Sequence, residues 1–228
     1  MKDRILPAVF VQRVFNIKHD KQIGTTTLIE FDKENYFVTA KHMFLDAKDS
    51  QKITIELNKD DQWKKLEGVI HFHNIEEIDI VIIKPTNLAF SSSGINFKDI
   101  PLIFGDEGFF LGFPLLKKTK DNSRINEGFP FPLVKKAIFS GSSNENNVNV
   151  LFFDLHNNKG FSGGPLFFKD RFKDGDNQWH LVGVLSGYLP QNNELVTPFG
   201  NLVYSENSGI LVAYGCKHIH EILSKVNK

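Results

Sequence analysis

A serine enclosed by glycines is the residue whose surroundings point most clearly to chemistry. The segment NKGFSGGPLFF places Ser162 between Gly160 and the pair Gly163 and Gly164. A serine hydroxyl becomes a good nucleophile when a neighbouring base removes its proton, and glycines allow the backbone around it to approach a reacting group closely. The spacing G-x-S-x-G predicts a nucleophilic serine. The alternative interpretation is a glycine-rich turn with a solvated hydroxyl.

The residues after Ser162 distinguish between two settings for such a serine. The nucleophile elbow of the α/β-hydrolases requires a helix directly after the serine, with its acidic residue and histidine later in the chain. Here Pro165 and the strand-like residues 166–168 follow instead. The later histidines have no typical triad setting; they are His180, His218 and His220. The elbow is therefore disfavoured, and an esterase on another fold stays open as an alternative that requires a helix after Ser162.

Two upstream segments contain the partners that a nucleophilic serine needs. His42 ends the segment Tyr-Phe-Val-Thr-Ala-Lys-His, and Asp79 begins the apolar run Asp-Ile-Val-Ile-Ile-Lys. Imidazole titrates near neutral pH, so His42 can take the serine proton and later protonate the leaving group. Asp79 can accept the other ring N–H and thereby fix the tautomer. The alternatives are an ordinary histidine at a strand end and solvated turn carboxylates, and the competitors of Asp79 are Asp46, Glu76 and Glu77.

In the order His, Asp, Ser, these segments resemble the catalytic segments of the trypsin-like (chymotrypsin-fold) serine peptidases. Further matching pieces extend the resemblance over most of the chain, at residues 24–29, 110–114, 138–141 and 183–187. The resemblance, closest to bacterial disulfide-free forms, implies a serine endopeptidase that forms an acyl-enzyme with His42, Asp79 and Ser162 and needs no cofactor or metal. The alternative is a catalytically inactive module of this fold that binds proteins.

The resemblance also implies residues that surround the reacting groups. The backbone N–H groups of Gly160 and Ser162 would form an oxyanion hole, and the Ser186 hydroxyl would hydrogen-bond Asp79. His156 would lie at the base of the pocket for the side chain that precedes the cut, with a wall formed by Ser186, Gly187 and Tyr188. Because His156 replaces a carboxylate, cleavage after Lys or Arg is not expected, and an acidic, polar or small side chain, or a merely structural His156, stays open.

The remaining pattern predicts an all-β fold. Apolar or alternating runs of strand length recur between polar or Gly/Asn/Asp-rich turns, as in AVFVQRVF, NYFVTA and WHLVGVLSGY. One helix is predicted near the end, where Ile219, Ile222, Leu223 and Val226 share a face. The resemblance implies a single peptidase domain over residues 1–228, with two six-stranded antiparallel barrels in 1–95 and 100–216 and a helix in 217–227. The segment SSSGINFKD, residues 91–99, is the predicted linker.

Composition limits the partners that the chain can be expected to have. The 228 residues contain 27 Lys and Arg against 27 Asp and Glu, so no charge excess favours binding to nucleic acid or to a membrane. A single cysteine, Cys216, and the absence of a signal-peptide pattern indicate a cytoplasmic protein. We expect a protein or peptide substrate and allow for a regulatory protein partner. The pairs His71 and His73, and Lys135 and Lys136, are predicted to be surface residues.

Overall fold

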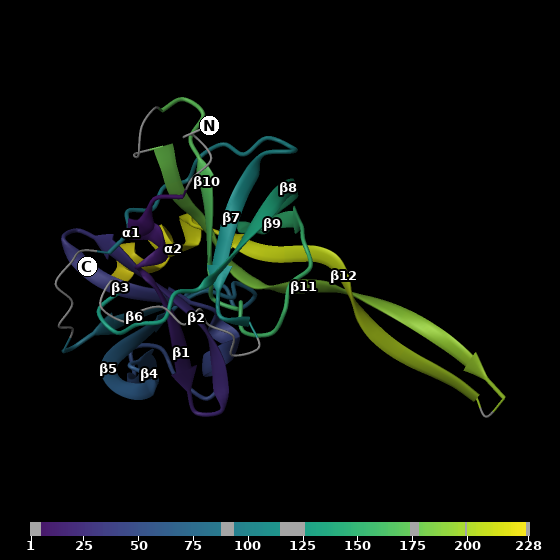
Figure 1. Ribbon diagram of the computed structural model, residues 1–228, viewed down its shortest axis with the longest axis horizontal. Coiled ribbons are helices and arrows are strands. Elements are labelled where there is room, and N and C mark those ends of the chain that lie inside the picture. The colour runs from purple at the N-terminus through teal and green to yellow at the C-terminus, as the bar shows by residue number, and fades with distance from the viewer. Residues whose placement is uncertain (1–5, 88–93, 115–125, 174–177, 199, 227–228) are drawn as a thin grey trace.

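Two closed barrels of six antiparallel strands make up most of the chain (Figure 1). The computed structural model describes residues 6–87, 94–114, 126–173, 178–198 and 200–226. The first barrel has the order β1-β2-β3-β6-β5-β4 and contains β1 (Val14–His19), β2 (Gln22–Phe31), β3 (Glu34–Thr39), β4 (Lys52–Lys59), β5 (Gln62–Phe72) and β6 (Val81–Pro85). The second has the order β10-β11-β12-β9-β8-β7 and contains β7 (Glu107–Gly112), β8 (Leu133–Glu145), β9 (Val148–Asp154), β10 (Pro165–Lys169), β11 (Trp179–Thr197) and β12 (Gly200–Gly215).

Tight turns of Asp, Asn and Lys join several neighbouring strands. Two consecutive residues have positive φ in each of three hairpins, at Asp32 and Lys33, Asp60 and Asp61, and Asn146 and Asn147. Two-residue turns of this kind match the twist of antiparallel strands and favour Asp and Asn, which tolerate the left-handed conformation. The polar segments of the sequence therefore set the pairing of β2 with β3, β4 with β5, and β8 with β9.

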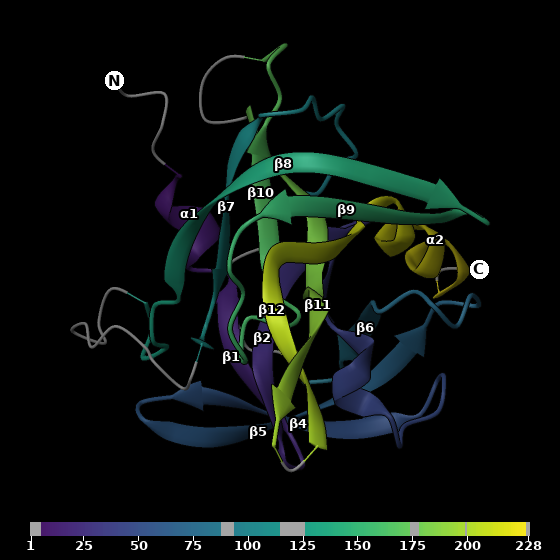
Figure 2. The same cartoon turned by 90° about the vertical axis from the view of Figure 1, so that its right-hand side faces the viewer.

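Three hydrophobic clusters hold the barrels together. The interior of the first barrel includes Phe15 and Leu28, and that of the second includes Phe110 and Phe153. A third cluster lies between the barrels and joins residues of both to the closing helix α2 (Lys217–Val226), through Ile29, Phe113, Phe167, Ile219, Ile222 and Leu223. Figure 2 shows α2 at the junction of the barrels. Because each barrel has its own core, the shared cluster determines how one barrel sits against the other.

The predicted fold class is confirmed, while one local prediction is wrong. The structure has two six-stranded antiparallel barrels and a helix at the end, as expected. The segment AVFVQRVF, residues 8–15, was predicted to be one strand. Its first four residues instead form the short helix α1 (Ala8–Val11), and β1 begins only at Val14. Residues 91–93 of the predicted linker lie outside the described residues, but Ile95 and Phe97 are buried and form β-bridges to Ile29 and Leu181. These side chains therefore belong to the core between the barrels.

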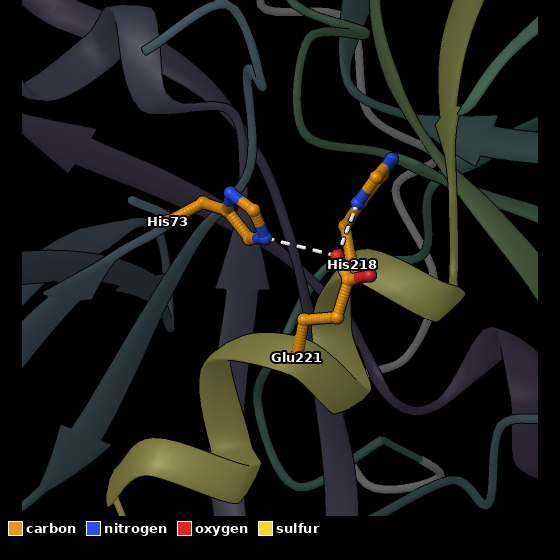
Figure 3. A group of neighbouring side chains, drawn as sticks. All are labelled: His73, His218 and Glu221. Carbon is orange, nitrogen blue, oxygen red and sulfur yellow. Dashed lines mark hydrogen bonds and ion pairs between the residues drawn. The ribbon is translucent and has the colours of Figure 1, made fainter. Parts of the chain in front are cut away.

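A cluster of two histidines and one glutamate links the first barrel to α2 (Figure 3). His73 follows β5, and its Nε2 lies 2.9 Å from Glu221 Oε2, while Nδ1 of His218 lies 2.6 Å from the same oxygen. The other ring nitrogens accept backbone N–H groups, from Ile75 at His73 Nδ1 (3.0 Å) and from Asn149 at His218 Nε2 (2.9 Å). Each histidine is therefore neutral, with its single N–H directed at Glu221.

We expect this cluster to make the protein less stable in mild acid. Burial lowers the pKa of His218 and His73 more than their hydrogen bonds to Glu221 raise it. Since the unfolded chain takes up protons that these buried rings do not, the free energy of unfolding falls as the pH drops from about 7 to 5. His218→Asn keeps an N–H donor for Glu221 but does not titrate, so urea unfolding of this variant should show a shallower fall. An equal pH dependence in both proteins would contradict this account.

Candidate active site

The three predicted catalytic residues come from both barrels. His42 lies in the short 3₁₀ helix η2 (Lys41–Phe44) that follows β3, and Asp79 lies just before β6. β3 and β6 are paired neighbours, so their ends bring His42 and Asp79 together. Ser162 lies in the turn before β10 of the second barrel. The strand β10 follows this serine at Pro165, so the helix required by the alternative esterase fold is absent from this part of the described chain.

Asp79 is the most heavily hydrogen-bonded residue of the site. Its Oδ2 lies 2.7 Å from Nδ1 of His42, and its Oδ1 accepts the His42 backbone N–H at 2.7 Å. The Ser186 hydroxyl donates to Oδ2 at 2.5 Å, as the resemblance implied. The carboxylate side chain is only 15% exposed, so these bonds are largely sheltered from water. They place the ring proton of a neutral His42 on Nδ1 and leave Nε2 as an acceptor.

The same carboxylate sets the proton affinity of His42. The hydrogen bond to Asp79 raises the pKa of His42 above its ordinary value, and the negative charge of Asp79 adds to this effect. Partial burial of the imidazole opposes the shift but does not cancel it. With 43% of its side chain exposed, His42 remains accessible from solvent. It has the environment of a histidine that can hold a proton transiently.

Ser162 is linked to the other two residues through Ser186. The Ser162 hydroxyl donates to the backbone carbonyl of Ser186 at 3.1 Å, while the Ser186 side chain contacts Asp79. The hydrogen bonds of the described residues include none between Ser162 Oγ and His42. The structure therefore brings the three predicted residues to one place, with the serine hydroxyl paired to a carbonyl.

The turn that carries Ser162 is pressed against the first barrel. Thr25 of β2 donates its backbone N–H to the Ser162 carbonyl (2.9 Å) and its hydroxyl to the Gly160 carbonyl (2.7 Å). At Gly163, where φ is +80°, an added Cβ would lie 2.1 Å from Thr39 Oγ1 and 2.2 Å from the Thr25 carbonyl oxygen. Only glycine fits this contact. Thr25 is a site residue that sequence reasoning missed, because it was read only as part of a matching strand.

Gly160 occupies the turn position that requires a left-handed backbone. Phe161 N–H bonds to the Asn158 carbonyl at 3.3 Å, and Gly160 has φ +102° at the third position of this turn. A positive φ at that position is the mark of a type II turn. Neither the Gly160 N–H nor the Ser162 N–H has an acceptor among the hydrogen bonds of the described residues. The oxyanion role of these two N–H groups stays a prediction.

A pocket of about 590 Å³ opens beside His42. Its lining comes from the turn between β1 and β2 and from η2, through His19, Asp20, Lys21, Gln22, His42, Met43, Leu45 and Asp46. The residues predicted to form the specificity pocket do not line it. His156 is an exposed residue after β9, while Ser186, Gly187 and Tyr188 lie in β11. Their role in substrate binding stays a prediction.

The prediction that Lys135 and Lys136 are simple surface charges is wrong for Lys135. Its ammonium donates to the His156 carbonyl at 2.5 Å and lies 5.8 Å from the centre of the Phe161 ring. Burial lowers the pKa of Lys135. The Lys135 ammonium thus links the segment before Ser162 to β8. Side chains alternate along this strand, so Lys135 points inward, whereas Lys136 points outward and pairs with Glu107.

Within the described residues, the group best placed to hold a metal ion lies away from Ser162, at His73, His218 and Glu221 (Figure 3). A histidine that binds a metal through one nitrogen carries a proton on the other. Here the outer nitrogens already accept backbone N–H groups, from Ile75 and Asn149. A metal ion bound to the inner nitrogen of each ring would require the ring proton on the outer nitrogen. That proton would then point at the backbone N–H group that the outer nitrogen now accepts. The hydrogen bonds fit a neutral cluster and do not fit a metal centre.

Comparison with known proteins finds similarity in structure. No family model matches the chain, and no curated protein matches its sequence. The HtrA-type protease AlgW, in a structure with a tripeptide, is 17% identical with a TM-score of 0.61; the match covers 96% of this chain but only 61% of AlgW. The Rv3671c protease of M. tuberculosis, in an inactive form, is 15% identical with a TM-score of 0.61, over 99% of this chain and 91% of that one.

A Glu endopeptidase in complex with MPD is 14% identical, with a TM-score of 0.58 and coverage of 96% of this chain and 92% of that one. The structural matches show a shared fold. Sequence identities this low do not show a shared activity, which has to be argued from the site. The chain has the double-barrel fold of the trypsin-like serine proteases.

Proposed function

We propose that the chain is a serine endopeptidase in which Ser162 is the nucleophile, His42 the general base and acid, and Asp79 the residue that orients His42. The observation that carries the proposal is the sheltered Asp79 carboxylate. It accepts both the ring and backbone N–H groups of His42, and through Ser186 it is connected to the Ser162 hydroxyl. This network supports a histidine poised to accept a proton from the serine.

The proposed reaction begins when Ser162 Oγ attacks the substrate carbonyl carbon and its proton passes to His42 Nε2. Asp79 stabilises the imidazolium, while the N–H groups of Gly160 and Ser162 bind the negative oxygen of the tetrahedral intermediate. Collapse of the intermediate breaks the C–N bond, and His42 protonates the departing amine. A water molecule then attacks the acyl-enzyme by the same steps and releases the carboxylate product and Ser162.

Substrate selection is proposed to depend on His156, Ser186, Gly187 and Tyr188, which would contact the side chain before the cut. The Lys135 ammonium, held on the His156 carbonyl, places a positive charge close to this region. That charge disfavours a basic side chain and supports an acidic one among the alternatives. The substrate would be a protein or peptide, and the peptide bond that is cut would lie in an extended segment bound beside Ser162.

The alternative function is a binding module without catalysis. It is favoured by the Ser162 hydroxyl, which is paired with the Ser186 carbonyl instead of with His42. In the enzyme, the hydroxyl must exchange this acceptor for the imidazole. A regulatory protein partner and a cytoplasmic setting belong to either proposal. Among the described residues, no helix has the length and apolar character that a bilayer crossing requires.

A fluorophosphonate probe separates the enzyme from the binding module. The enzyme proposal predicts covalent labelling of the wild type at Ser162, no labelling of Ser162→Ala, and greatly slowed labelling of His42→Ala, because only an activated serine attacks the probe at a useful rate. Intact-protein mass spectrometry gives the site and the rate. A folded wild type that stays unlabelled would favour the binding module.

Gly160→Ala tests the oxyanion turn. An added Cβ would lie 2.3 Å from the Phe113 carbonyl oxygen at a φ of +102°, so the turn must rearrange and turn its N–H away. Loss of one such donor typically lowers kcat by about 10²–10³-fold. Gly105→Ala is the matched control, since Gly105 also has a positive φ but an added Cβ there meets nothing within 4 Å. Equal losses of peptide hydrolysis in both variants would argue against an oxyanion role for Gly160.

Asp79→Asn tests the coupling between Asp79 and His42. Because the bond to the Asp79 carboxylate raises the pKa of His42 and burial lowers it, removing the charge should lower this pKa below its wild-type value. The imidazole can be followed by NMR as a function of pH. Asp46→Asn is the control, because Asp46 lines the same pocket as His42 without a hydrogen bond to its ring. A His42 titration unaffected by Asp79→Asn would contradict the assigned geometry.

A further inference from the structure

β11 and β12 continue past the barrel as a two-stranded ribbon. Residues from Pro190 to Thr197 pair with residues from Asn207 back to Gly200, and Figure 1 shows this ribbon projecting far from the rest of the chain. β10 pairs with β11 only up to Val184, and β9 pairs with β12 only from Ile210 onward. In the described part of the chain, the outer ribbon, residues 190–197 and 200–207, has no further strand on either edge.

Exposed apolar side chains lie on both faces at the end of this ribbon. Leu195 lies opposite Leu202 on one face; Val196 and Val203 lie on the other, opposite Asn201 and Glu194. The exposed fractions of the four apolar side chains are 51%, 58%, 75% and 68%, in the order named. An isolated two-stranded hairpin is at best marginally stable in water, and clustered exposed apolar side chains mark a surface that binds something. These four apolar residues are referred to below as the ribbon tip.

The free edge of β11 begins at the candidate nucleophile. Gly163 N–H bonds to the Leu185 carbonyl (2.7 Å), Leu185 N–H bonds to the Gly164 carbonyl (2.8 Å), and the next carbonyl, of Ser186, accepts the Ser162 hydroxyl. Beyond this point no further strand of the described residues pairs with this edge out to the ribbon tip, although the pairing of β11 with β12 shifts between Tyr188 and Pro190. The tip lies about nine residues past Gly187, or roughly 30 Å along an extended strand.

The direction of β11 determines which part of a bound chain would reach the tip. β11 runs outward from Ser186, so a chain paired antiparallel to it runs inward and ends at Ser162. The residues N-terminal to the scissile bond would therefore lie along the ribbon. A chain of about ten or more residues before the cut would contact the tip, and a shorter one would not.

The charge of the ribbon limits its occupant. Residues 188–210 contain Glu194 and Glu206 and have no Lys, Arg or His. Both carboxylates accept hydrogen bonds across the ribbon, from Asn201 and Asn193, and they lie on opposite faces of it. A second copy would bring identical carboxylates together, and an anionic membrane would repel them. A polypeptide with apolar and basic residues is complementary to this surface.

We propose that the ribbon binds the segment of an extended polypeptide substrate that lies N-terminal to the scissile bond, and that it prefers segments that contain both apolar and basic residues. The inference rests on the proposed peptidase function and defines its substrate class as long, unfolded chains. Backbone pairing along β11 would supply general affinity, and the ribbon tip and the two glutamates would supply selectivity.

Binding can be measured separately from catalysis with Ser162→Ala. The probes are two fluorescent peptides that share one C-terminal sequence, one of sixteen residues with alternating Leu and Lys upstream and one of six residues. The test variant changes the ribbon tip, with Leu195, Val196, Leu202 and Val203 all replaced by Ser. The control is Phe172→Ser, which removes an exposed apolar side chain outside the ribbon.

We expect anisotropy to show the long peptide binding at least about tenfold more tightly than the short one, with an affinity that falls in salt. The ribbon-tip variant should lose this difference, and Phe172→Ser should keep it. Circular dichroism of the barrels checks folding, and Glu194→Gln with Glu206→Gln, which retains the apolar tip, should lose the salt dependence. Equal binding of the long peptide by the tip variant would overturn the inference.

Two other results would overturn it in favour of another occupant. A wild-type dimer that the tip variant abolishes would identify a second copy of the chain as the occupant. Tip-dependent binding to phosphatidylcholine vesicles would identify a lipid surface. Failure of the peptidase proposal is seen separately, as absence of fluorophosphonate labelling in a protein that still binds the long peptide through its ribbon.

Discussion

The contact between Thr25 and the turn around Ser162 is the constraint on which the site depends. Each barrel closes on its own core, so neither barrel alone fixes the position of the serine relative to His42. Thr25 binds the carbonyls of Gly160 and Ser162 at once, and the absent side chain of Gly163 allows the two backbones to meet. A contact of this kind has little freedom, because a shift of either backbone breaks hydrogen bonds that are buried from water.

The rest of the interface between the barrels supports this contact. Ile29 of the same strand as Thr25 and Phe113 beside Gly160 belong to one buried cluster, which also includes the inner face of α2. The Phe113 N–H donates to the Thr25 hydroxyl, so that hydroxyl is both donor and acceptor. Glu221 of α2 binds His73 after β5 of the first barrel, and His218 of α2 accepts the Asn149 N–H from β9 of the second. The closing helix therefore links the two barrels.

The sequence was sufficient to predict the features that depend on local pattern. Alternating runs and polar turns predicted an all-β fold, and the resemblance carried by short motifs implied the two barrels. The same motifs predicted His42, Asp79 and Ser162, which the structure gathers in one place. Features that depend on tertiary contacts were not predicted. Lys135 was read as a surface charge because its sequence does not show the carbonyl it binds, and His73 and His218 are 145 positions apart.

The ribbon was missed for a different reason. Asn, Pro and Ser are frequent between Tyr188 and Ile210, and these residues usually indicate turns. Here they form paired strands because the two barrel strands that flank them extend the pairing outward from both sides. Helix α1 was missed in a similar way, since its four residues are apolar and lie next to a real strand.

The Ser186 carbonyl connects substrate binding to activation of the serine in the proposed mechanism. It accepts the Ser162 hydroxyl in the structure, and it is also the first carbonyl on the open edge of β11 that an extended chain would meet. A substrate N–H that bonds to this carbonyl competes with the Ser162 hydroxyl for it. In the proposed mechanism the released hydroxyl turns to Nε2 of His42, because Nδ1 is held by Asp79. Occupation of the β11 edge and activation of the serine would then be coupled through this one carbonyl.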